Sequence, residues 1–130
     1  MKKILLLSIL IFFISCSKTK NKKNISGTWN ISEFYNSYQT PSYSGDTTVY
    51  NIGSLTFNND GTGNSNTTAW GNETFNWSND KENIYLESNN NIDTFKIIEI
   101  SKNKLILTIH ESGMSSSGLE NYNYKYTLTK

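Results

Sequence analysis

Apolar and polar residues alternate with a period of two along most of the chain after Gly27, and no ten-residue window has helical spacing. The clearest case lies late in the sequence, where Tyr122, Tyr124, Tyr126 and Leu128 share one parity. Alternation of this kind places successive side chains on opposite faces of a β-strand. The pattern predicts strands over eight ranges: 28–35, 47–58, 61–69, 72–78, 83–88, 92–101, 104–111 and 121–129.

The composition excludes a helical bundle. Asn, Ser, Thr and Gly supply 58 of the 130 residues, whereas the strong helix formers Ala and Gln occur once each and Arg is absent. Eight consecutive short strands leave no room for crossover helices, so the strands must be antiparallel. We therefore expect an all-β fold, an eight-stranded antiparallel up-and-down barrel, because closure removes exposed sheet edges. A flat two-sheet sandwich fits the same pattern.

Two strands show irregular alternation. In the sixth, Phe95 and Ile97 belong to one parity and Ile98 and Ile100 to the other. A β-bulge near Ile97-Ile98 would reconcile the two parities, because a bulge inserts one extra residue. The long second strand contains Gly53, which predicts a bend there.

The connections between the strands differ in length. By the boundaries above, the two longest are 36–46 and 112–120, which follow the first and seventh strands. In an up-and-down barrel these connections share one end, and the tight turns at Asn59-Asp60, 79–82 and 102–103 share the other. We expect long loops over 36–46 and 112–120, and we expect them to carry any recognition.

The N-terminus predicts export. Lys2 and Lys3 precede Ile4–Ile14, a run that is apolar except for Ser8. Eleven helical residues cover about 16 Å, roughly half of a ~30 Å hydrocarbon core, so residues 1–15 are predicted to be a signal peptide rather than a membrane span. The sequence Phe-Ile-Ser-Cys at 13–16 resembles the lipobox of bacterial lipoproteins. This resemblance implies a diacylglycerol group on Cys16, which has no second cysteine with which to form a disulfide.

Lipidation of Cys16 implies a membrane-anchored protein. Its acyl chains would hold the protein to a membrane effectively permanently. Residues 16–26 lack apolar periodicity apart from Ile25 and are predicted to form a flexible lipidated tether. The remaining residues, 27–130, suffice for one domain. We expect a monomer that is lipid-anchored to the bacterial cell envelope at the outer membrane.

Four landmarks carry a family resemblance. Gly27-Thr28-Trp29 opens the first strand, and the segments 55–63, 74–77 and 105–108 follow in order. Together they resemble the small lipocalin-like lipoproteins of the Bacteroidota, over about residues 25–130. The resemblance implies a barrel whose closed end is filled by Trp29, and non-enzymatic binding of a small apolar or amphipathic molecule. The chain departs from the family in two ways: we find no basic residue positioned to pack on Trp29, and even the longest loops are short for a ligand-binding lipocalin.

Residues typical of catalysis or metal binding are scarce. His110 is the single histidine, and its parity is opposite to that of Leu107 and Ile109, so it should face solvent rather than act as a general base. A zinc site needs several His or Cys ligands, and we predict no metal site, no cofactor and no catalytic residues. A net charge of +1 does not indicate nucleic-acid binding.

The aromatic side chains supply the candidate ligand pocket. If the barrel closes, its interior is predicted to be lined by Leu55, Phe57, Phe75, Trp77, Tyr122, Tyr124 and Tyr126. An eight-stranded barrel is just wide enough for side chains to fill it, although buried tyrosines need partners for their hydroxyls and so favour a cavity. Both interpretations are open at this point. The alternative function is a protein- or glycan-interaction module with a solid barrel and exposed aromatics such as Tyr38, Tyr43 and Trp70.

Overall fold

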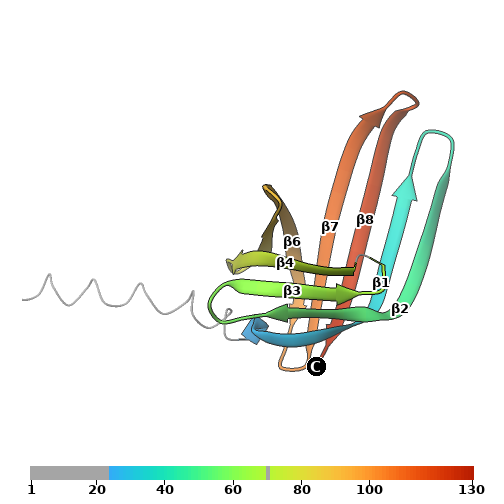
Figure 1. Cartoon of the computed structure of the whole chain (residues 1–130). Helices are drawn as coiled ribbons and strands as arrows, with labels where there is room; N and C mark the ends of the chain where they lie inside the picture. The colour runs from blue at the N-terminus through green and yellow to red at the C-terminus, as the bar shows by residue number, and fades with distance from the viewer. Residues whose placement is uncertain (1–23, 70) are drawn as a thin grey trace, which may run out of the picture.

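The computed structural model describes residues 24–69 and 71–130 as a single closed β-barrel. The predictions for the signal peptide, for Cys16, for the first part of the tether and for Trp70 lie outside the described residues. The strands are β1 (Gly27–Gln39), β2 (Ser44–Phe57), β3 (Thr62–Thr67), β4 (Gly71–Asn79), β5 (Asn83–Ser88), β6 (Asn91–Ile100), β7 (Lys104–Ser115) and β8 (Gly118–Thr129). Each strand pairs antiparallel with its neighbour in sequence, and β8 pairs with β1 (Figure 1). The barrel prediction is confirmed and the sandwich is excluded.

Four of the strands are longer than the barrel needs. Most of β1 pairs with β2 on one side and, from Asn30 to Gln39, with β8 on the other. β3 pairs with only Gly53–Phe57 of β2, and β6 with only Leu105–Thr108 of β7. The remainder forms a four-stranded sheet in the order β2-β1-β8-β7, which projects beyond the barrel (Figure 1). We call this projection the arm and define it by its four ranges, 36–39, 44–47, 109–115 and 118–124.

The prediction of two long loops is wrong. Most of 36–46 and 112–120 is strand, and the turns between the strands cover only 40–43 and 116–117. The Tyr43 carbonyl accepts a hydrogen bond of 2.7 Å from the Thr40 amide, and the Tyr38 and Tyr43 rings lie 5.5 Å apart. Small polar residues hide the strand pattern in these segments, whereas the pairing of β1 with β2 and β8, and of β7 with β8, satisfies their backbone groups.

Both predicted irregularities are present. The register of β6 against β7 shifts between Ile97 and Glu99, and the extra residue, Ile98, is 55% exposed. In β2, Asn51 and Gly53 have positive φ values of 54° and 139°, opposite a register shift in β1. A Cβ on Gly53 would lie 2.1 Å from the Asn66 carbonyl oxygen, so only glycine fits where β2 bends from the arm into the barrel.

Trp29 fills one end of the barrel. Its side chain is fully buried, and its indole Nε1 donates a 2.6 Å hydrogen bond to the Ile25 carbonyl. The Lys130 ammonium lies 4.2 Å from the indole ring centroid and donates a 2.9 Å hydrogen bond to the Ser26 carbonyl. The expectation that no basic residue packs on Trp29 is therefore wrong. Lys130 reaches the indole because β8, which it follows, runs beside β1.

Large side chains close the barrel around Trp29. The Phe57 ring lies 5.2 Å from that of Trp77, edge to face, a favourable geometry for aromatic pairs. The Trp77 indole donates a 2.9 Å hydrogen bond to the Asn58 carbonyl, which satisfies its one polar atom. The rest of this buried layer consists of aliphatic residues, among them Ile25, Ile84, Leu105 and Leu128. Within residues 24–69 and 71–130, no helix is long and apolar enough to span a membrane.

The buried layer predicts a large stability loss in Trp29→Ala. Truncating a fully buried tryptophan should lower the free energy of unfolding by about 3–5 kcal/mol, since it leaves a cavity. Ile98→Ala, at the exposed bulge, is the control and should change it by less than about 0.5 kcal/mol. Denaturant melts measure both. A loss below about 1 kcal/mol in Trp29→Ala would contradict the placement of the indole.

The turn between β4 and β5 predicts an acid-sensitive contribution to stability. The Asp80 carboxylate accepts hydrogen bonds from the Tyr85 hydroxyl at 2.6 Å and from the amides of Glu82 and Asn83 at 2.8 and 2.7 Å. These bonds, the one from Tyr85 first, lower the pKa of Asp80 to about 2. Because the folded pKa lies below the unfolded value, this stabilisation is present above about pH 4 and is lost as the pH falls towards 2. Urea melts from pH 6 to pH 2 should show a smaller decline in Asp80→Asn than in the unchanged chain.

Candidate functional site

The half of the barrel away from Trp29 contains a cavity of about 170 Å³. Its apolar wall is formed by Ile31, Leu55, Phe75, Leu86, Phe95, Leu107 and Tyr126. The polar lining residues are Ser65, Glu73, Ser88 and Asp93, which lie towards the β3–β4 and β5–β6 turns. The cavity is therefore apolar inside and polar at the end nearest these two turns, which we call the mouth. The arm lies at the same end of the barrel.

Small side chains on β3 leave this space open. The inward-facing residues of β3 are Gly63, Ser65 and Thr67, which occupy much less volume than the aromatic residues of neighbouring strands. Gly63 also gives room to Phe75, since a Cβ there would lie 2.2 Å from a Phe75 ring carbon. An engineered apolar cavity of about 150 Å³ binds benzene, so a volume of about 170 Å³ accepts a single ring or a short alkyl chain.

A groove continues from the cavity along the inner face of the arm. It has a volume of about 360 Å³ and is lined by Phe34, Asn36, Asp93, Phe95, Ile109, Glu111, Tyr124 and Tyr126. Asp93, Phe95 and Tyr126 line both the cavity and the groove, so the two adjoin. A molecule with its end in the cavity would therefore extend over the arm.

Aromatic rings follow one another from the cavity to the arm. Phe95 meets Tyr126 edge to face at 5.7 Å, and Phe34 lies 4.9 Å from Tyr126. Phe34 stacks on Tyr124 at 6.1 Å, and Tyr124 stacks on Tyr122 at 6.4 Å. All these distances fall within the range favourable for aromatic pairs. The rings form an apolar wall with polar hydroxyl groups.

The tyrosines of this wall are held in the neutral phenol form. Burial raises the pKa of Tyr126 well above its usual value, and the charges of Glu111 and Asp93 raise it further, together with Tyr124. Burial also raises the pKa of Tyr124, with Glu111 adding to the effect. For Tyr122 the first cause is a hydrogen bond to Glu120, which raises its pKa. Carboxylates therefore lie close enough to these tyrosines to disfavour their phenolate forms.

Asn36 has a buried side-chain acceptor without a partner. Its Oδ1 accepts no hydrogen bond from any described residue. Buried polar atoms almost always have a partner, and leaving one unmet costs about 1–3 kcal/mol. Because the atom is buried, it is not exposed to the groove that Asn36 lines.

The predicted pocket residues divide into three sets. Leu55 and Phe75 line the cavity, Tyr126 lines both cavity and groove, and Tyr124 lines the groove. Phe57 and Trp77 belong to the packed core on the closed side, and Tyr122 lies farther along the arm beside Tyr124. Whether any of them contacts a ligand stays a prediction.

Several residues of the site were not identified from the sequence, among them Asn36, Glu73, Asp93 and Glu111. Asp93 shares the parity of Phe95, and Glu111 shares that of Ile109, so parity was a signal that could have found them. Asn36 was assigned to a loop, so no parity was available for it. His110 lies exposed on the opposite face of the arm, and its Nδ1 is 2.7 Å from Asn123 Oδ1.

Among the residues that the structure describes, no three His, Cys, Asp or Glu side chains are grouped so as to hold a metal ion.

Comparison with known proteins gives one match. The family model of the lipocalin-like domain matches residues 25–107, from the residue buried under Trp29 to the cavity-lining Leu107 of β7. Neither the curated proteins nor the solved structures include a significant match.

Proposed function

Because this chain belongs to the lipocalin-like domain family, we propose that it is a non-enzymatic binding protein for a small apolar or amphipathic molecule. The observation that carries the proposal is the cavity of about 170 Å³ that adjoins the aromatic groove. Ligand sites in proteins are concave and mostly apolar, with a few polar groups at fixed positions, and this interior has that character.

The shape of the site limits the ligand's apolar part. The cavity takes one ring or a short chain, and the remainder of the molecule lies against Phe34 and Tyr124 in the groove. Burial of apolar surface contributes about 25 cal/mol per Å², so both parts add to affinity. Hydroxyl groups on the tyrosines and carboxylates at the cavity mouth favour an amphipathic ligand over a purely apolar one.

We propose further that the protein is anchored to the bacterial envelope through lipidated Cys16, as the lipobox-like sequence at 13–16 indicates. The strand β1 begins at the closed end of the barrel, and the two tips of the arm lie at the opposite end. A chain attached through residues preceding β1 would hold its closed end towards the membrane. The cavity mouth and the arm would then face away from it.

A protein- or glycan-interaction function is favoured by one observation. Large apolar side chains are exposed at the tips of the arm, where Met114 is 79%, Tyr43 63% and Leu119 53% exposed. Tip residues of this kind are typical of contact surfaces. The cavity favours the small-molecule function, because the alternative assumes a barrel whose interior is filled by side chains.

The small-molecule proposal predicts that a larger side chain in the cavity weakens ligand binding. The probe is 2-phenylethanol, and the protein is the Cys16→Ala chain purified without detergent. Leu86→Trp places an indole in the cavity and should weaken binding at least tenfold in calorimetric titration. Ile92→Trp is the matched control, because Ile92 is 65% exposed on the outer face of β6, and it should leave the affinity unchanged.

Equal affinity in Leu86→Trp and Ile92→Trp would contradict the proposal and favour the interaction module. Native mass spectrometry of the protein purified from its own host would then identify what it carries in the cell.

The anchoring proposal makes a separate prediction. Cys16→Ala should abolish palmitate labelling and move the protein from the membrane to the soluble fraction, because the acylated sulfur is lost. Lys20→Ala, within the same segment, should leave labelling unchanged. Retained labelling in Cys16→Ala would disprove lipidation at this residue.

A further inference from the structure

We propose that the ligand is an organic cation: an aromatic or short-alkyl group that carries a protonated amine. The inference rests on the proposed function and adds the charge of the ligand. It follows from the distribution of charge over the two faces of the barrel wall.

Acidic side chains of the inner face gather at the mouth. Glu73 and Asp93 line the cavity at the turn end, and Asp93 and Glu111 line the groove that continues from it. They come from three strands, β4, β6 and β7, so the barrel closure, rather than one local segment, brings them to the same opening. None of the three forms an ion pair with another described residue.

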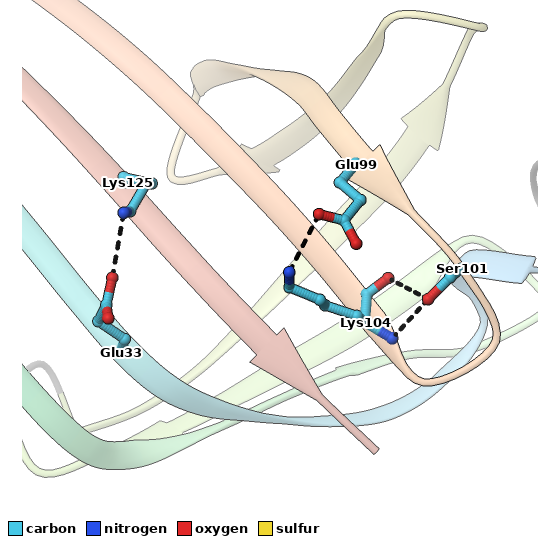
Figure 2. A network of polar contacts seen from close by, with 5 residues as sticks. All are labelled: Glu33, Glu99, Ser101, Lys104 and Lys125. Atoms are coloured by element: carbon cyan, nitrogen blue, oxygen red, sulfur yellow. Dashed lines mark hydrogen bonds and ion pairs between the residues drawn. The ribbon is translucent and has the colours of Figure 1, made fainter.

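The cationic side chains of the described residues lie elsewhere. Lys125 pairs with Glu33 at 3.1 Å, and Lys104 pairs with Glu99 at 3.1 Å, both on the outer face (Figure 2). Alternation places Lys96 on the outer face as well, Lys81 and Lys102 lie in turns at the closed end, and Lys130 covers Trp29. Within residues 24–69 and 71–130, no lysine lines the cavity or the groove. The negative charge of the inner face is thus left for a ligand.

One further feature of the groove suits an ammonium group. Phe34 and Tyr124 line it, and aromatic rings attract cations that lie within about 6 Å of the ring centroid. A carboxylate ligand would meet like charge at the mouth, and a neutral one would gain no ionic attraction from the acidic groups.

The exposure of the acidic residues determines how the cation binds. Glu73, Asp93 and Glu111 are exposed, so the ammonium group would stay partly hydrated while the ring is buried in the cavity. This arrangement avoids the large desolvation penalty of a buried ion pair. The apolar end therefore points towards Leu107 and Phe75, and the amine points towards the mouth.

The test compares three probes that share a phenyl group and a two-carbon linker: 2-phenylethylammonium, 2-phenylethanol and 3-phenylpropanoate. Titration calorimetry uses the Cys16→Ala chain at pH 7 and low salt. The ammonium probe should bind at least fivefold more tightly than the alcohol, and the carboxylate more weakly than the alcohol. Addition of 0.5 M NaCl should reduce the affinity for the ammonium probe and leave that for the alcohol unchanged.

Isosteric variants assign the preference to named residues. Asp93→Asn combined with Glu111→Gln should reduce the preference for the ammonium probe over the alcohol to twofold or less. Glu87→Gln, an exposed residue next to Leu86 whose side chain faces outward, should leave the preference unchanged. Thermal melts verify that each variant is folded, as expected for exposed substitutions.

The outcomes separate the inference from the function on which it rests. Equal binding of all three probes, abolished by Leu86→Trp, would overturn the cationic ligand and leave the small-molecule function intact. Binding of none of the probes would overturn both. A preference that survives in the double variant would overturn the assignment to Asp93 and Glu111.

Discussion

The shape of the protein depends on unequal strand lengths. β1, β2, β7 and β8 have 12 to 14 residues, whereas β3 and β5 have only 6. Because the four long strands are neighbours across the point of closure, their surplus residues pair with one another and form the arm. The short strands end at the rim of the barrel. The cavity therefore opens beside a sheet that extends its inner wall, and the site spans both parts.

Much of the fold could be predicted from the sequence, because the alternation of apolar and polar residues along a strand can be read from neighbouring residues alone. The barrel, the bulge beside Ile98 and the bend at Gly53 all follow from parity and from the conformational freedom of glycine. The strands of the arm were missed because Ser, Thr and Gly over 42–48 show no apolar alternation. Their strand conformation comes from pairing with β1 across the 40–43 turn, and β1 is paired on its other edge with β8, which is far away in the sequence.

The candidate site was harder to predict than the fold for the same reason. Aromatic residues that share a parity were identified, yet which of them pack together and which leave space depends on the facing strands. Phe57 and Trp77 belong to the packed core at the end of the barrel that Trp29 fills. Phe75 borders a cavity, because the facing residues of β3, Gly63 and Ser65, are small. The contact of Lys130 with the indole likewise requires the register of β8 against β1.

The closure of the barrel also sets the order in which the chain can fold. Every strand pair but one joins neighbours in sequence, whereas β1 meets β8 at a large sequence separation, such as the 95 positions from Ser32 to Thr127. Hairpins form quickly, but a contact between distant segments must overcome a larger loop entropy, so we expect closure to be the slow step. A nascent chain that has been synthesised only as far as β7 retains two open sheet edges and no complete cavity. Until β8 is available, Leu128 is missing from the buried layer and the barrel cannot close.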